Sequence, residues 1–96
     1  MPEHRQPPQT RLMTICNKRG LHARASARFV QTAERYDARV TVEREGVTVG
    51  GTSIMGLMML AASAGSSITV HASGRQAVQV LDAIEQLVTD RFGEDT

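Results

Sequence analysis

The chain has 96 residues, the length of one small domain with a single modest core. Its 11 basic and 10 acidic residues give a net charge of +1, which argues against a strongly basic surface for nucleic acid. We therefore expect no nucleic acid as partner. No apolar run approaches the ~18 residues that a membrane span requires, so we expect no membrane as partner either. Cys16 is the single cysteine, which excludes an internal disulfide and a cysteine-based zinc cluster.

The first nine residues are the least regular part of the sequence. Met1 to Gln9 is polar, contains all three prolines of the chain and lacks the apolar core of a signal peptide. We therefore expect residues 1–9 to be a disordered arm and the protein to be cytoplasmic.

The first strand and the first helix are predicted on either side of a polar loop. Arg11 to Asn17 combines apolar and β-branched residues, which favours a strand. Asn17 to Gly20 breaks this pattern and predicts a loop. Ala23 to Arg35 then has apolar residues at three- and four-residue spacing, which predicts an amphipathic helix.

The middle of the chain predicts a hairpin followed by a short helix. Arg39 to Arg44 alternates polar and apolar residues, and Glu45-Gly46 turns the chain into a second strand at Val47 to Val49. Ser53 to Ala62 is an apolar run that opens with a natural N-cap, so it predicts a short helix.

The last part predicts one more strand and one more helix. Ser67 to Ala72 alternates again, with His71 facing away from its two neighbours and toward solvent, and Arg75 to Arg91 carries an apolar stripe at helical spacing. The order is therefore β-α-β-β-α-β-α. Alternating strands predict an antiparallel sheet with one wet face, and helices then cover the other face. We expect an α+β fold, a two-layer open-faced sandwich of four strands and three helices.

Gly20 to Ala25, "GLHARA", places a histidine just before a predicted helix. The first N–H groups of a helix lack intrahelical partners and lie at the positive end of its dipole, where a phosphate is favoured. A neutral imidazole is a nucleophile near neutral pH. A phosphoryl group on His22 would meet the backbone N–H groups of Ala23 and Arg24, and the Arg24 guanidinium would add a charge-assisted hydrogen bond. Position alone favours the simpler interpretation, a helix-cap residue.

The motifs that the chain lacks also bear on its chemistry. It contains no GxxxxGK[ST] nucleotide loop and no set of His, Cys, Asp or Glu at metal-ligand spacing. We therefore expect no metal and no cofactor. If His22 reacts, the phosphoryl group must arrive activated on another protein, so the chain would be a carrier rather than an enzyme.

Ser53 opens the methionine-rich helix, where an N-cap role alone explains a serine. A phosphate there would be favoured by the helix dipole and would add negative charge beside an apolar surface. The apolar residues that follow cannot all face inward on a short helix, so some are expected to be exposed: Met55, Leu57, Met58, Met59 and Leu60.

"GLHARA", followed about thirty residues later by "SIMGLMML", resembles the HPr family of histidine-containing phosphocarrier proteins of the phosphotransferase system. The resemblance runs from Leu12 to Phe92. It implies an HPr-like phosphocarrier domain at residues 10–93, a short acidic tail at residues 94–96, the family's β-α-β-β-α-β-α fold and a monomer.

The resemblance also implies a role for each motif residue. His22 would accept a phosphoryl group from phospho-Enzyme I, which is charged by phosphoenolpyruvate, and would pass it to an Enzyme IIA. Arg24 would support the phosphohistidine, and Ser53 would be the regulatory serine that HPr kinase/phosphorylase modifies. The apolar surface that partners contact would contain Ile54, Met55, Leu57 and Met58.

Two departures from the sugar-transport members point to one branch of the family. Ala25 stands where those members usually have proline, and Gly50-Gly51-Thr52 differs from the common pattern with a lysine next to the serine. This combination is similar to HPr proteins of α-proteobacteria and of the nitrogen-related branch. It implies a regulatory Enzyme IIA rather than direct sugar uptake.

Two alternatives from other functional classes are open. The first is an HPr-like binding regulator that acts through Ser53 phosphorylation without phosphoryl relay, but relatives of that kind replace the histidine. The second is a small-molecule sensor domain with a similar β-α-β arrangement, which would need a ligand cleft and usually a dimer.

Overall fold

Four strands and three helices alternate in the order β-α-β-β-α-β-α within residues 6–96, the part of the chain that this computed structural model describes. None of the helices in that part is long and apolar enough to cross a membrane. The elements are β1 (Gln6–Thr14), α1 (Ala23–Ala33), β2 (Arg39–Arg44), β3 (Val47–Gly50), α2 (Ile54–Met59), β4 (Ser67–Gly74), α3 (Ala77–Thr89) and a short 3-10 turn, η1 (Arg91–Gly93).

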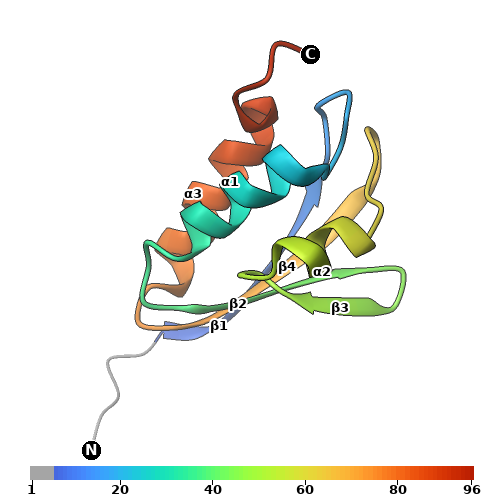
Figure 1. Ribbon diagram of the computed structural model, residues 1–96. Coiled ribbons are helices and arrows are strands. Elements are labelled where there is room, and N and C mark those ends of the chain that lie inside the picture. The colour runs from blue at the N-terminus through green and yellow to red at the C-terminus, as the bar shows by residue number, and fades with distance from the viewer. Residues whose placement is uncertain (1–5) are drawn as a thin grey trace, which may run out of the picture.

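The strands form one antiparallel sheet with the spatial order β1-β4-β2-β3. α1 and α3 run side by side across one face of this sheet, and α2 lies beside α1 near β3 (Figure 1). Among the described residues, no helix covers the opposite face of the sheet. The two-layer α+β sandwich and the element order predicted from the sequence are therefore confirmed.

β1 begins earlier than predicted, at Gln6 instead of Arg11. It is an edge strand paired only with β4, and its register shifts near its start, where two consecutive prolines lie. Proline is tolerated at such a place because its missing N–H need not interrupt the hydrogen bonds of the sheet. The expectation of a disordered arm is therefore wrong for residues 6–9, and residues 1–5 lie outside the described residues.

Each helix ends before its predicted C-terminus, and after α2 and α3 the backbone turns left-handed within the stretch that was predicted to be helical. α2 stops at Met59, and Ala61 takes a left-handed φ of 53°. α3 stops at Thr89, and Arg91 takes a left-handed φ of 56°. A left-handed residue cannot continue a right-handed helix, so the chain turns away at both places.

The core lies between the sheet and the helices, where the inward-facing residues of the strands pack against the apolar stripes of α1 and α3. Alternate residues of β2 and β4 point inward, and the residues between them face the open side. The largest side chains that are fully buried in this layer are Phe29, Phe92, Ile15, Leu57, Ile68, Leu81 and Ile84.

Replacing Leu81 by alanine tests whether this layer carries the stability of the fold. Leu81 is fully buried on α3, so Leu81→Ala removes apolar contacts and leaves a cavity. We expect the free energy of unfolding to fall by about 2–5 kcal/mol in urea denaturation. Met55→Ala, at a side chain that is 71% exposed, is the control and should change it by only about 0.5 kcal/mol. Equal losses in the two variants would contradict this description of the core.

Candidate functional site

The loop between β1 and α1 is fixed by a close backbone contact with the segment after α2. Gly20 has a left-handed φ of 67°, and a Cβ atom there would lie 2.3 Å from the carbonyl oxygen of Ala62. The next residue, Leu21, is buried, and its N–H donates to the same Ala62 oxygen at 2.9 Å. Only glycine fits this approach, and the contact therefore sets where His22 lies.

His22 is the N-cap of α1, with an extended backbone at φ −75° and ψ −177°. Its carbonyl oxygen accepts the N–H of Ser26 at 2.9 Å, but its side chain makes no capping hydrogen bond. Within residues 6–96, the N–H groups of residues 23–25 at the start of α1 make no hydrogen bond. The imidazole is thus free of the helix backbone, and the helix still presents unpaired donors.

The imidazole of His22 contacts a carboxylate from the end of the chain. Nε2 of His22 lies 2.5 Å from Oε2 of Glu94, and the two side chains are 22% and 12% exposed. The other carboxylate oxygen, Oε1, accepts a hydrogen bond from Nδ2 of Asn17 at 3.0 Å. Asn17 is fully buried, and the same Nδ2 also donates to the carbonyl oxygen of Gly20 at 2.9 Å. Asn17 therefore ties the carboxylate to the loop that carries His22.

A reversal of the backbone after α3 brings Glu94 to this position. Arg91, Phe92 and Gly93 are all left-handed, with φ values of 56°, 55° and 76°. Two of them are not glycine, which is uncommon for L-residues and is a real departure for a bulky phenylalanine. Phe92 is fully buried, and Arg28 of α1 donates a hydrogen bond to its carbonyl oxygen. Burial of the ring thus offsets the cost of the turn.

The three last residues were expected to be a short acidic tail outside the domain, and the structure differs. The Glu94 side chain is mostly covered by its contacts with His22 and Asn17. Two residues later, the carbonyl oxygen of Thr96 accepts the backbone N–H of Lys18 at 3.0 Å. This segment, which leaves η1 in red in Figure 1, is therefore part of the site.

The surroundings of Glu94 keep its carboxyl group ionised. Burial alone would raise the pKa of Glu94. The hydrogen bonds from Asn17 and His22, together with the positive charges of His22 and Arg19, outweigh burial and hold that pKa below its ordinary value. Glu94 is therefore a carboxylate throughout the neutral range.

Arg24 lies beside this pair. It lines a cavity of about 260 Å³ that Glu94, the partner of His22, also lines, and its role toward a phosphoryl group stays a prediction. Within residues 6–96 its guanidinium group makes no hydrogen bond or ion pair. The full lining is Arg19, Arg24, Arg28, Gly93, Glu94, Asp95 and Thr96.

Ser53 is the N-cap of α2, as the sequence predicts. Its Oγ accepts the backbone N–H of Gly56 at 2.9 Å. The opposite end of α2 leads to Ala62, which contacts the His22 loop, and a six-residue helix is about 9 Å long. Ser53 and His22 are therefore at opposite ends of α2 and belong to two separate parts of one surface.

The exposed side chains of α2 form an apolar patch between these two parts. Ile54, Met55 and Met58 are exposed, which agrees with the surface implied by the resemblance. Leu57 does not belong to it: this side chain is 0% exposed and packs in the core, so its assignment to the partner surface is wrong. Met59, at 73% exposed, extends the patch instead.

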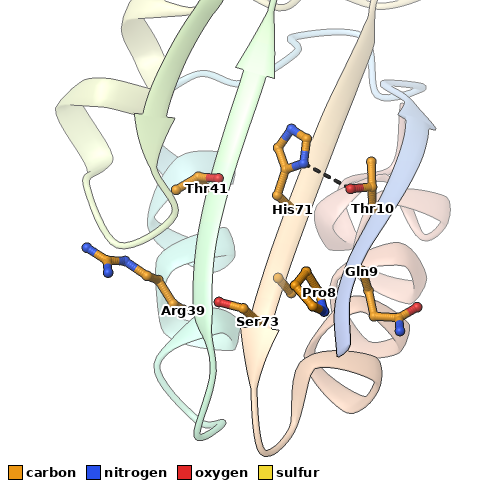
Figure 2. A pocket seen from close by; sticks show the side chains of 8 residues that line it. Pro8, Gln9, Thr10, Arg39, Thr41, His71 and Ser73 are labelled. Carbon is orange, nitrogen blue, oxygen red and sulfur yellow. Dashed lines mark hydrogen bonds between the residues drawn. The ribbon is translucent and has the colours of Figure 1, made fainter. Parts of the chain in front are cut away.

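His71 is far from this chemistry, on the face of the sheet that carries no helix. Figure 2 shows it on β4, with Nδ1 directed at Oγ1 of Thr10 on β1, 3.0 Å away. Its Nε2 lies 3.2 Å from Oε1 of Glu43 on β2. The prediction of a strand histidine facing away from Val70 and Ala72 is confirmed, because both of those residues are buried.

The sequence reasoning missed Asn17 and Glu94. They lie 77 residues apart in the chain, and Glu94 is 72 residues from His22, so no local spacing links them. The available signal was Phe92 followed by Gly93 at the end of a helix. A large apolar residue needs burial, and a glycine after a helix marks a chain reversal.

Comparisons with known proteins identify the family and the fold of this chain. A family model described as "PTS HPr component phosphorylation site" matches residues 9–90, which include His22 and Ser53 and end before Glu94. The chain is 47% identical over 81 residues to the phosphocarrier protein HPr of Cupriavidus necator, covering 84% of this chain and 91% of that one. It is 47% identical over 83 residues to the HPr of Pseudomonas aeruginosa, covering 85% and 92%. The crystal structure of HPr-C-His from Thermoanaerobacter tengcongensis matches with a TM-score of 0.87 at 36% identity, covering 92% and 99%.

Acid titration of the folded protein tests the Glu94 contacts. Because the pKa of Glu94 is lower in the folded than in the unfolded chain, its stabilising effect is present above about pH 4 and is lost as the pH falls through the folded value. We expect the free energy of unfolding of the wild type to decline in acid more steeply than that of Glu94→Gln. Asp95→Asn, at the exposed carboxylate next in the chain, is the control. Parallel acid profiles for the wild type and Glu94→Gln would show that the contacts contribute nothing.

Proposed function

This chain belongs to the HPr family of phosphocarrier proteins, and we propose that it carries its phosphoryl group on His22. The group comes from phospho-Enzyme I, which takes it from phosphoenolpyruvate, and goes on to an Enzyme IIA. The observation that carries the proposal is the state of His22: an N-cap side chain without a capping hydrogen bond, at a helix start whose N–H groups at residues 23–25 are unpaired within residues 6–96. Phosphoryl oxygens would accept from those groups.

The side chains around His22 fit this reaction. The Nε2 atom is taken up by Glu94, so Nδ1 is the nitrogen left for the incoming phosphorus. The backbone N–H groups of Ala23 and Arg24 are proposed to receive the phosphoryl oxygens. The Arg24 guanidinium, which has no partner within residues 6–96, is proposed to turn toward the added negative charge. The phosphoryl group would thus be stabilised by this chain's own donors.

The acceptor is proposed to be a regulatory Enzyme IIA rather than a sugar permease component, working in the cytoplasm with this chain as a monomer. The support is the residue after Arg24: Ala25 leaves the first turn of α1 without the fixed backbone that a proline would supply. The apolar patch of α2 borders the His22 loop through the contact at Ala62. A partner that covers the patch would therefore also reach the imidazole.

Ser53 is proposed to be a regulatory phosphorylation site for an HPr kinase/phosphorylase. The hydroxyl group sits at the edge of the apolar patch, next to Ile54 and Met55. A phosphate there would retain the helix cap and add about two negative charges to a surface otherwise suited to apolar contact. Partners that dock on the patch would be repelled or left with a desolvated charge, so transfer through His22 would slow.

A labelling assay tests the carrier function. Purified Enzyme I and labelled phosphoenolpyruvate should place acid-labile label on the wild type, and His22→Ala should abolish it. His71→Ala is the matched control, since His71 is a histidine on the other face of the sheet, and it should be labelled normally. No label on folded wild type would overturn the relay. The alternative, a binding regulator acting through Ser53, would then account for the same patch.

A charge substitution tests the proposed regulation. Ser53→Asp keeps a good N-cap while adding a negative charge, so it should slow phosphoryl transfer from Enzyme I about 10-fold with little change in stability. Thr52→Asp places the same charge one residue away, at an exposed position outside the cap, and should have a smaller effect. Equal rates for Ser53→Asp and the wild type would contradict a regulatory role for this position.

A further inference from the structure

We propose that Glu94 is a positioning residue for His22: it holds the proton on Nε2, leaves Nδ1 as the reactive nitrogen, and retains that proton while the phosphoryl group is carried. The inference rests on the proposed function, because it concerns how His22 takes up and releases the group. It concerns a residue beyond the stretch that the family match covers.

The contact with Glu94 determines which ring nitrogen of His22 carries the proton. Nε2 of His22 and Oε2 of Glu94 are 2.5 Å apart, and Glu94 is ionised. A carboxylate only accepts hydrogen bonds, so a contact this short requires a proton on Nε2. The neutral form of the imidazole, which is the nucleophile, has a single N–H, so in that form Nδ1 carries the free lone pair. Nδ1 makes no hydrogen bond within residues 6–96.

The Glu94 carboxylate is itself held in place by Asn17. The Nδ2 atom of Asn17 donates to both Glu94 and the Gly20 carbonyl oxygen. Because both of these partners are acceptors, the Asn17 amide must direct its nitrogen, and not its oxygen, toward them. The Oδ1 atom of Asn17 is buried and makes no hydrogen bond in the part of the chain described, which is an unfavourable arrangement for a polar atom. The carboxylate is thus held at both oxygens.

The backbone before Glu94 is also fixed by its surroundings. Three consecutive left-handed residues end at Gly93, where a Cβ atom would lie 2.9 Å from Nη1 of Arg28. Strained backbone of this kind persists where surrounding contacts determine it, and it clusters at functional sites. Here the buried Phe92 ring and Arg28 fix the turn. The position of Glu94 beside His22 is therefore determined by the packing of the preceding residues.

The consequence for the reaction follows from the proton count. The Nδ1 lone pair forms a bond to phosphorus, the nitrogen–phosphorus bond on the donor histidine breaks, and its electron pair returns to the donor. Nε2 keeps its proton, so the carried species is a phosphoimidazolium paired with the Glu94 carboxylate. When the acceptor attacks phosphorus, the electron pair returns to Nδ1 and a neutral imidazole departs.

Removing the carboxylate should weaken this arrangement. Without the negative charge, Nε2 of the phosphorylated ring loses its proton to water more readily. Transfer would then have to expel an anionic imidazolate, which is a poor leaving group. The other charged groups at the site are Arg19, Arg24 and Arg28, whose positive charges favour loss of that proton, and Asp95, which opposes it. Glu94 is the one group in direct contact with the ring among those described.

Three variants separate the charge of Glu94 from its hydrogen bond. Glu94→Gln removes the charge and leaves one acceptor oxygen, for which Asn17 and Nε2–H of His22 compete. Glu94→Ala removes both acceptor oxygens, and Asp95→Asn removes a charge from the same cavity. Each protein is checked for folding by urea denaturation. Each is then charged with Enzyme I and phosphoenolpyruvate, and single-turnover transfer to an Enzyme IIA is followed from weakly acidic to weakly alkaline pH.

We expect transfer from Glu94→Gln to be about 10-fold slower than from the wild type at neutral pH, with the pH range of fast transfer moved to lower pH. Glu94→Ala should be at least as slow, and Asp95→Asn should slow transfer less than Glu94→Gln does. Nitrogen NMR of the unphosphorylated protein should show one tautomer, protonated on Nε2, in the wild type, and a mixture in Glu94→Ala. Glu94→Asp, with a shorter side chain, should recover part of the rate.

The outcomes for the two proposals are distinct. A wild type that takes no label from Enzyme I overturns the carrier function, and the NMR comparison then still decides whether Glu94 fixes the ring. A wild type that is labelled and transfers, with identical pH profiles in all Glu94 variants, overturns the positioning role and leaves the carrier function standing. An unchanged tautomer in Glu94→Ala also overturns it.

Discussion

The backbone of the β1–α1 loop lies directly against the segment after α2, and the whole site depends on this approach. Gly20 can be no other residue, because a Cβ atom would occupy the place of the Ala62 carbonyl oxygen. Since Leu21 is held to the same oxygen, the start of α1, the imidazole of His22 and the end of α2 are fixed relative to one another. The His22 imidazole and the apolar patch are thus two parts of one rigid surface.

The elements that could be predicted from the sequence are those whose periodicity is set by burial. β4 and the stripe of α3 have one buried face each, so their residues repeat at the period of the element. The start of β1 has no such signal, because an edge strand with two prolines resembles a loop in composition. Leu57 could not be separated from the other large apolar residues of α2 either, since only packing decides which of them is inside.

The site divides in the same way. His22, Ala23 and Arg24 could be proposed from the sequence because they are neighbours at a helix start, where backbone chemistry is local, and because their motif resembles the HPr family. The carboxylate on the imidazole could not, because its place depends on a left-handed turn and on the burial of Phe92, and both are properties of the folded chain. The regulatory branch implied by Ala25 and by the residues before Ser53 stays a prediction.

The reversal after α3 has a consequence for how members of the family are compared. The stretch shared with the family ends at residue 90, and the chain makes its turn and places its carboxylate only afterwards. Two proteins that align equally well across that stretch can therefore differ in whether a carboxylate contacts the histidine. Truncation or fusion near Thr96 would remove or displace the Glu94 contact with His22 without changing any aligned position.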